Sequence, residues 1–289
     1  MRISLYINLA LVKTPISYPG GKSRAVKMLY EIASEVEFDT YVEPFLGGGS
    51  LALYITQMRP DVKVFVSDAF HPLVCFWETL RDNPEKLINH LLVLRSQVNT
   101  EEECRGLYLE CHEILKHIEG TILEKAVAFY VANKMAYGGL MRGDDCFSIY
   151  NSKKKFSEYG INKLSKYPDI IRNWAIVEED YSVVVENNLK NRTLVYLDPP
   201  YDIKHSTLYG SEANLHKNFN HDSFTDLCEA WRESLTKIVI SYNQEMRDKF
   251  PKWHAETYEL WYSMQTTTEY QKKQNSKAEL VLTNYFTNR

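Results

Sequence analysis

Residues 40–68 read TYVEPFLGGGSLALYITQMRPDVKVFVSD. The runs at 40–45 and 62–67 have the composition of strands, and residues 50–57 between them have helical composition and follow three glycines. A strand, a crossover helix and a second strand in this order form a β-α-β unit, in which the two strands lie parallel. The first part of the chain therefore predicts an α/β fold.

The same pattern returns towards the C-terminal end of the chain. Strand-like runs at 193–197 and 237–241 are separated by a polar loop and a helical stretch at 224–234. The simplest assembly places these strands and the first two in one mostly parallel sheet. We therefore expect one α/β domain built from residues 1–79 and 169–289.

Residues 80–168 are expected to form a second domain, inserted into the first. From about residue 76 to residue 134, leucines and isoleucines recur at helical spacing, which predicts a largely helical layer. Residues 138–160 then read GGLMRGDDCFSIYNSKKKFSEYG and combine turn formers with lysines and aromatics. This change of character predicts a β-hairpin or a loop.

Charge and cysteine usage argue against several classes of protein. The net charge of −4 and the pI of about 6.1 do not fit a protein that coats nucleic acid nonspecifically. The cysteines are odd in number and form no CxxC pair, which predicts free thiols in a reducing cytoplasm and no metal site. The N-terminal residues contain a short apolar stretch but lack the long apolar region and the cleavage site of a signal peptide. No apolar run reaches the roughly 18 to 20 residues that span a bilayer.

The glycines of EPFLGGGS lie where a strand must turn sharply into a helix. Gly47, Gly48 and Gly49 carry no Cβ, so a ligand is able to approach the backbone closely there. The helix that follows offers free N–H groups and the positive end of its dipole to an anionic group. The spacing is neither GxGxxG nor GxxxxGK[ST], which speaks against dinucleotide and P-loop sites. A tight turn with no ligand is the alternative.

Two further features accompany the glycine turn. Asp68 ends the next strand, where an acidic side chain is able to accept hydrogen bonds from ribose hydroxyls; a helix cap is the alternative. Residues 17–23 read SYPGGKS, in which Gly20 and Gly21 shape a turn and Lys22 is able to reach a carboxylate or a carbonyl. An ordinary loop before a helix is the alternative for this second motif.

The most informative stretch is LVYLDPPYD, residues 194–202, in which a hydrophobic strand runs directly into two prolines. Proline has no N–H, so this turn presents only acceptors. An exocyclic amine is a pure donor: Asp198 is able to accept one of its hydrogens and the Pro200 carbonyl the other. The nitrogen lone pair is then directed at a sulfonium methyl group, and Tyr201 offers a ring for stacking the base. A proline-rich turn without chemistry is the alternative.

A base inside a duplex cannot reach such a turn, so it must be flipped out of the stack. Positive charge near the site would offset part of that cost, and residues 133–166 carry seven basic residues against three acidic ones, a net charge of +4. Tyr150, Phe156 and Tyr159 are interleaved with these charges. We therefore expect contacts to DNA phosphates from this segment; a solvated face is the alternative.

The order SYPGGK, EPFLGGGS, Asp68, a variable block and DPPY resembles the Dam-type, alpha-group DNA adenine-N6 methyltransferases. Two later segments, NHDSFTDL and KAELVLTNY, look like the closing-loop and late-strand segments of that family. The resemblance covers most of the chain. It implies a Rossmann-like methyltransferase sheet with an inserted, largely helical DNA-recognition domain that carries a β-hairpin or loop. It also implies a cytoplasmic enzyme of the bacterial or phage type.

The family's functional residues carry over to matching positions. S-adenosylmethionine is the implied cofactor, S-adenosylhomocysteine its product and double-stranded DNA the partner. The implied catalytic residues are Asp198, Pro199, Pro200 and Tyr201. The implied cofactor-binding residues are Tyr18, Gly21, Lys22, Phe45, Gly47, Gly49, Ser50, Asp68 and Asp180. The implied DNA-binding residues are Asn133, Arg142, Lys153, Lys154 and Lys155.

The chain departs from the family in the recognition block. Members that read GATC carry a segment resembling NRxxxNGxxRxNxxGxFNxPxG, whereas residues 133–156 read NKMAYGGLMRGDDCFSIYNSKKKF. Another short adenine-containing site is therefore as compatible as GATC. Three alternatives stay open: methylation of cytosine N4, methylation of adenine N6 in RNA, and a catalytically silent DNA-binding relative. A cognate restriction endonuclease that acts separately is a further expected partner.

Overall fold

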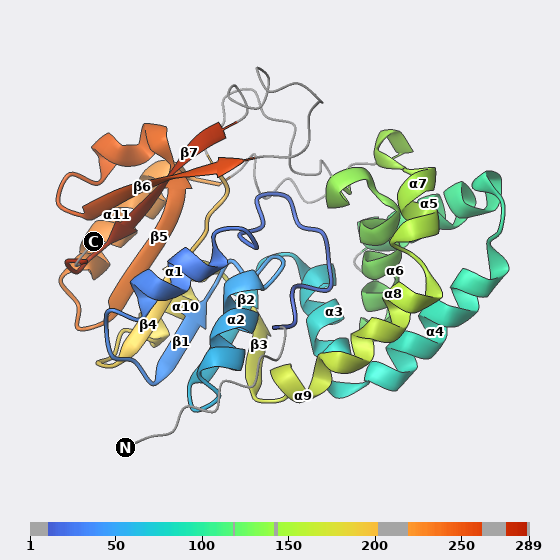
Figure 1. Cartoon of the computed structure of the whole chain (residues 1–289), viewed down its shortest axis with the longest axis horizontal. Coiled ribbons are helices and arrows are strands. Elements are labelled where there is room, and N and C mark those ends of the chain that lie inside the picture. The colour runs from blue at the N-terminus through green and yellow to red at the C-terminus, as the bar shows by residue number, and fades with distance from the viewer. Residues whose placement is uncertain (1–10, 118, 142–143, 202–218, 262–275, 288–289) are drawn as a thin grey trace.

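The computed structural model describes residues 11–117, 119–141, 144–201, 219–261 and 276–287. Its centre is a seven-stranded sheet with the order β3-β2-β1-β4-β5-β7-β6 (Figure 1). Strands β1 to β5 pair in parallel, and β7 runs antiparallel between β5 and β6. The strands span β1 Thr40–Glu43, β2 Lys63–Asp68, β3 Trp174–Glu178, β4 Thr193–Leu197, β5 Lys237–Asn243, β6 His254–Trp261 and β7 Ser276–Thr283.

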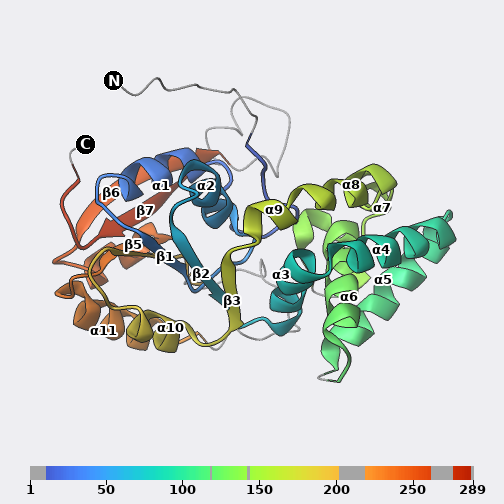
Figure 2. The same ribbon diagram turned by 90° about the horizontal axis from the view of Figure 1, so that it is seen from below.

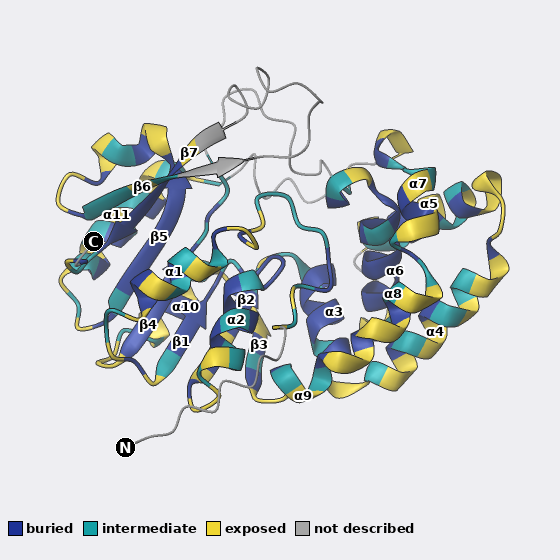
Figure 3. Ribbon diagram, in the orientation of Figure 1, coloured by how far each residue is buried: buried dark blue, intermediate teal, exposed yellow. Residues whose placement is uncertain are grey.

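Helices cover both faces of this sheet. Helices α1 (Val26–Ala33) and α2 (Ser50–Met58) lie on one face, and α10 (Tyr181–Asn187) and α11 (His221–Arg232) lie on the other (Figure 2). The central strands β1, β4 and β5 are almost completely buried as a result (Figure 3). In β4, Leu194 and Tyr196 join one hydrophobic cluster while Val195 and Leu197 join the other. The mostly parallel α/β sheet predicted from the sequence is confirmed.

The chain between β2 and β3 is almost entirely helical and lies beside the sheet (Figure 1). Helix α6 is at its centre, and it is buried nearly all round because its residues are apolar on every side. Thr100 and Thr121 begin α5 and α6 with capping boxes. The helices are α3 His71–Asp82, α4 Pro84–Gln97, α5 Glu101–Lys116, α6 Ile122–Met135, α7 Ile149–Lys154, α8 Glu158–Asn162 and α9 Pro168–Ile171.

The hairpin considered for residues 138–160 does not form among the described residues of that segment. Short helices form instead, with 3-10 turns at Tyr137–Gly139, Asp144–Cys146 and Lys163–Lys166 and a single isolated bridge between Ala136 and Phe147. Ser148 and Ser157 explain the difference, because their hydroxyls accept hydrogen bonds from the first turns of α7 and α8. The short 3-10 turn η4 (Gln244–Lys249) follows β5.

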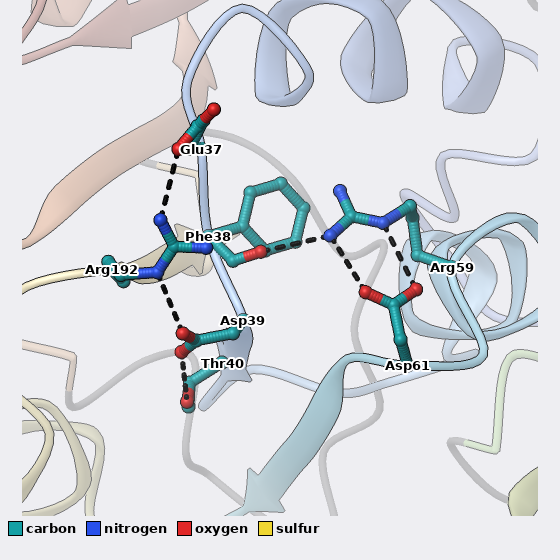
Figure 4. A network of polar contacts seen from close by, with 7 residues as sticks. All are labelled: Glu37, Phe38, Asp39, Thr40, Arg59, Asp61 and Arg192. Atoms are coloured by element: carbon teal, nitrogen blue, oxygen red, sulfur yellow. Dashed lines mark hydrogen bonds and ion pairs between the residues drawn. The ribbon is translucent and has the colours of Figure 1, made fainter.

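Charged side chains tie together the strand ends that lie opposite the turns after β1 and β4 (Figure 4). Arg192 pairs with Glu37 and Asp39, and Arg59 pairs with Asp61 while donating to the carbonyl of Phe38. These exposed pairs contribute little to stability. The polar chemistry described below lies at the other, carboxyl ends of the strands.

All five cysteines are free and buried. In the part of the chain that the structure describes, no helix is both long and apolar enough to cross a bilayer. Among those same residues, no group of three or more His, Cys, Asp or Glu side chains is arranged to hold a metal ion.

Candidate active site

A cavity of about 480 Å³ lies at the carboxyl ends of β1 to β4. This is where ligands bind in open α/β sheets, because the loops diverge there. The helical segment contributes Leu115, Gly139 and Met141 to the lining. The sequence-predicted residues that line the cavity are Tyr18, Gly21, Lys22, Phe45, Gly47, Gly49, Ser50, Asp68, Asp180, Asp198, Pro199 and Pro200. The fold therefore brings together, in one cavity, residues far apart in the sequence.

The glycine turn is needed for packing as well as for access. Gly47 and Gly49 have φ angles of 45° and 61°, in the left-handed region that favours glycine. A Cβ at Gly47 would lie 2.8 Å from the ring of Tyr18, so part of the space freed by the glycine holds an aromatic side chain. Helix α2 begins directly after Gly49, and its first residue, Ser50, faces the cavity.

Asp68 joins the turn to the end of β2. Its Oδ2 accepts a 2.9 Å hydrogen bond from the N–H of Gly47, and its Oδ1 accepts one of 3.0 Å from the N–H of Phe70. Burial raises the pKa of this carboxyl to about 6, although the backbone donors oppose the rise. The bond to Phe70 does not cap α3, because Phe70 is itself the N-cap residue and the helix has no side-chain cap. A carboxylate has about four acceptor positions, so a ribose remains compatible with these two bonds.

Aromatic rings form another part of the wall. The rings of Phe45 and Tyr181 stack with centroids 5.1 Å apart and planes 27° apart, and Phe219 meets Phe45 edge-on at 5.9 Å. Asp180 lines the cavity beside them, and its Oδ1 accepts a hydrogen bond of 2.9 Å from the N–H of Ser182 at the start of α10. Tyr181 was not predicted; its position directly after Asp180 is the signal that would have found it.

Asp198 forms an ion pair with Lys22. The Lys22 Nζ lies 2.8 Å from Asp198 Oδ1 and 3.7 Å from Glu279 Oε2, and it donates a 3.0 Å hydrogen bond to the Gly20 carbonyl. Desolvation raises the pKa of Asp198 to about 6, Lys22 opposes that rise and Glu279 adds to it. The predicted lysine of the SYPGGK motif therefore reaches the predicted catalytic carboxylate.

Tyr201 is held from both its ring and its hydroxyl. The ring stacks on Tyr242 with centroids 5.8 Å apart and planes 15° apart, and the ammonium of Lys22 lies 4.8 Å from its centroid. The hydroxyl donates a 3.1 Å hydrogen bond to Glu279. Tyr201 is not among the residues that line the cavity, although its neighbours Lys22 and Pro200 are, and its predicted role as a stacking surface for a base stays a prediction.

Two buried carboxylates were not predicted from the sequence. Glu43, the first residue of EPFLGGGS, lines the cavity and accepts a 2.7 Å hydrogen bond from the hydroxyl of Tyr41. Burial, with help from the charge of Asp198, raises the pKa of Glu43 to about 8. Glu279 lies in the KAELVLTNY segment and is 2% exposed. A glutamate inside a run of buried strand residues was the signal in both cases.

The predicted DNA-binding residues do not behave alike. Asn133 is completely buried: its amide donates to the carbonyl of Ser17 at 2.6 Å and its oxygen accepts from the N–H of Ser17 at 3.0 Å. In this arrangement it positions the Ser17 segment instead of reaching a surface where DNA would bind. Arg142 lies outside the described residues. Lys153 and Lys154 are exposed on α7, and Lys155 is half-buried with its ammonium 3.4 Å from the Ser17 hydroxyl.

Comparison with known proteins identifies the family. The model of the D12 class N6 adenine-specific DNA methyltransferases matches residues 18–276. The chain belongs to this family. That result confirms the resemblance drawn from the order of the motifs, and it identifies DNA as the substrate of the family and a methyl group as what its members transfer.

Individual family relatives are distant in sequence. The chain is 25% identical to the type II methyltransferase M.MjaIII of Methanocaldococcus jannaschii over 77% of this chain and 80% of that protein. It is 21% identical to the type II methyltransferase M.CviBI of Paramecium bursaria Chlorella virus NC1A over 95% of this chain and the whole of that protein. It is 24% identical to M1.LlaDCHI of Lactococcus lactis over 77% of each. All three relatives are named as type II methyltransferases, a term used for the methyltransferases of restriction-modification systems.

Proposed function

We propose that this chain transfers a methyl group from S-adenosylmethionine to the N6 amino group of an adenine that is flipped out of double-stranded DNA within a short sequence. One observation carries the proposal: the glycine turn at 47–49 and the acceptor-only turn at 198–200 line the same cavity. An electrophile held by the first turn would face an amine held by the second.

The donor set of the cavity fits S-adenosylmethionine. Asp68 would accept from the ribose hydroxyls, and Asp180 with the stacked rings of Phe45 and Tyr181 would hold the adenine of the cofactor. The start of α2, at Ser50, would face its carboxylate. When bound, this cofactor supplies an electrophilic methyl group on a sulfonium. A cavity of about 480 Å³ lies within the ordinary size range for a small-molecule site.

The residues of the chain would orient the amine. Asp198 accepts one amine hydrogen and the carbonyl of Pro200 the other, so the nitrogen lone pair points away from both acceptors. The cofactor would supply the methyl carbon to this nitrogen, and its carbon–sulfur bond would break with the electron pair left on sulfur. One amine proton leaves to solvent by way of Asp198, which regains its charge. No covalent enzyme intermediate is needed.

The helical segment would supply the DNA contacts. Lys153 and Lys154 are exposed on α7, and the neighbouring rings of Tyr150 and Tyr159 are 61% and 72% exposed. Exposed ammonium groups beside exposed aromatic rings are suited to phosphates and to unstacked bases. Following the type II relatives, we extend the proposal to modification of a site that a separate restriction endonuclease cuts.

Transfer of a tritiated methyl group to PCR-amplified bacterial DNA, which carries no methylation, tests the proposal. We expect wild-type protein to label this DNA and Asp198→Ala to lower the rate by at least about 100-fold. Binding of S-adenosylhomocysteine, measured by calorimetry, serves as the control for an intact cofactor site. Equal labelling by both proteins would remove Asp198 from the chemistry. Digestion to nucleosides and mass spectrometry then distinguishes N6-methyladenine from N4-methylcytosine, and RNA as the acceptor tests the remaining alternative.

A further inference from the structure

Asp198, the carboxylate that the proposed function needs, already forms an ion pair with Lys22. Lys22 is 4% exposed, and its ammonium is 2.8 Å from Asp198. An ammonium at this distance draws on the same oxygen charge that an amine hydrogen would. Asp198 keeps free acceptor positions beside Lys22, but it would accept more strongly from an incoming adenine amine if Lys22 moved away from it.

Glu279 provides that place. Its Oε2 is 3.7 Å from the Lys22 ammonium, so a movement of about 1 Å transfers Lys22 from a close pair with Asp198 to a close pair with Glu279. Glu279 lies on β7, between Asn243 of β5 and Tyr258 of β6, and is almost completely buried. The second carboxylate is therefore held in place by the sheet.

Two hydrogen bonds connect Glu279 to the catalytic turn and to β6. Oε2 accepts hydrogen bonds from the hydroxyl of Tyr258 at 2.6 Å and from that of Tyr201 at 3.1 Å. Tyr201 is the last residue of DPPY. Glu279 therefore contacts both Lys22, the partner of Asp198, and the residue that ends the catalytic turn.

We propose that Glu279 is a positioning residue for methyl transfer, which receives Lys22 when the adenine amine binds Asp198. The inference rests on the proposed function. The ammonium of Lys22 lies within reach of two carboxylates, those of Asp198 and Glu279. As the amine nitrogen becomes positively charged, it repels Lys22 towards Glu279. Asp198 then balances the charge of the nitrogen.

Two variants separate charge from packing. Glu279→Gln keeps an oxygen that accepts from the tyrosine hydroxyls but removes the charge that attracts Lys22. Tyr258→Phe removes a hydrogen bond to Glu279 and keeps the charge. We expect Glu279→Gln to lower kcat about 10-fold or more while KM for S-adenosylmethionine stays within about twofold, and Tyr258→Phe to change kcat by less than about threefold.

A second measurement needs neither cofactor nor DNA. The pKa of Asp198 is followed by NMR of ¹³C-labelled aspartate, assigned with Asp198→Asn. Lys22, before α1, lowers the pKa of Asp198 and Glu279 of β7 raises it. The charge of Asp198 in turn raises the pKa of the other groups around it: Tyr41 and Glu43 of β1, Tyr196 of β4, Tyr201 of the catalytic turn and Tyr258 of β6. Because Glu279 raises the pKa of Asp198, Glu279→Gln should lower it by about half a unit or more. Tyr258→Phe should leave it in place.

The inference is overturned if Glu279→Gln keeps kcat within about threefold of wild type, if Tyr258→Phe loses as much activity as Glu279→Gln, or if the pKa of Asp198 is the same in both variants. A different result marks the failure of the proposed function. If wild-type protein labels neither DNA nor RNA, that function is wrong, while the NMR titration still tests the coupling of Glu279 to Asp198.

Discussion

The backbone N–H of Gly47 donates a 2.9 Å hydrogen bond to Oδ2 of Asp68, and this bond fastens the glycine turn after β1 to the end of β2. The other carboxylate oxygen of Asp68 holds the N–H of Phe70. One side chain therefore sets the shape of two cavity-lining segments. The loss of Asp68 should therefore weaken ligand binding by disturbing both segments, in addition to removing any direct contact between Asp68 and the ligand.

Asp68→Ala is the first prediction. The change removes the acceptor for two backbone N–H groups, and hydrogen bonds to a charged group contribute about 1.5–3 kcal/mol each. We expect affinity for S-adenosylhomocysteine, measured by calorimetry, to fall at least about 10-fold. Asp61→Ala is the matched control, because Asp61 is exposed, precedes the same strand at its other end and pairs only with Arg59 among the ion pairs of Figure 4. Equal affinities in the two variants would contradict the role assigned to Asp68.

The glycine turn yields a prediction about stability. A Cβ at Gly47 would meet the Tyr18 ring at 2.8 Å, and its φ of 45° is unfavourable for alanine. We expect Gly47→Ala to lower the free energy of unfolding by about 1–3 kcal/mol in urea titrations. Gly106→Ala, in α5 with open space around it, should instead raise it by about 0.5–1 kcal/mol.

The combination of Tyr18→Ala with Gly47→Ala separates the clash with the Tyr18 ring from the backbone strain at Gly47. Removing the ring relieves the clash but not the backbone strain, so the double variant should lose less than the sum of the single losses. Additive losses would show that the ring of Tyr18 does not occupy the space next to Gly47.

The raised pKa of Glu43 predicts that the stability of the protein depends on pH. Its pKa is raised to about 8 in the folded protein from 4.5, so between these values the folded state holds a proton that the unfolded state has lost. This carboxyl therefore makes the free energy of unfolding decrease as pH rises through that window, by up to about 1.4 kcal/mol per pH unit. Glu43→Gln cannot ionise, so its stability relative to wild type should increase steadily from pH 5 to pH 8.

The matched control for this measurement is Glu37→Gln. Glu37 is exposed and pairs with Arg192 at the opposite ends of the strands. Its stability relative to wild type should show no such increase over the same range. A pH-independent difference between Glu43→Gln and wild type would mean that Glu43 is already ionised at pH 5.

Local patterns were enough to predict the α/β frame and most of the cavity. The strand-turn-helix at 40–57 and the acceptor-only turn at 198–200 are encoded by adjacent residues, and parallel strands necessarily place their carboxyl ends together. Local patterns do not predict the partners of buried side chains. Glu279 meets Tyr201 and Lys22 only because β7 inserts between β5 and β6, an arrangement that no spacing in the sequence expresses.

The same limit bears on two further sequence-based expectations. Turn formers at 138–160 favoured a hairpin or a loop, but Ser148 and Ser157 cap short helices there, and hydroxyls serve helix starts as readily as turns. Asn133 was expected to contact DNA because the recognition block of the family carries asparagine at that point. Its real partner, Ser17, is 116 residues away.

Asn133 should therefore act through the fold. Asn133→Ala leaves the N–H and the carbonyl of Ser17 without their side-chain partner in a buried environment, which costs about 1–3 kcal/mol per unsatisfied group. We expect a lower Tm and weaker binding of S-adenosylhomocysteine, since Tyr18 follows Ser17 directly. Asn162→Ala, at an exposed position in α8, is the control. An unchanged Tm together with weaker DNA binding would restore the direct contact to DNA.

Lys153 and Lys154 should affect DNA binding and leave the fold intact. Both are exposed on α7, so the double change to alanine removes charge without disturbing the core. We expect affinity for a DNA duplex, measured by fluorescence anisotropy, to fall and the slope of log K against log salt concentration to become shallower by about one for each phosphate that the variant no longer neutralises. The double variant Lys63→Ala/Lys252→Ala removes two exposed lysines elsewhere and should leave the slope unchanged. Identical salt slopes for the two double variants would mean that α7 does not face the DNA backbone, because counterion release depends on which charges meet phosphates and not on the total charge of the protein.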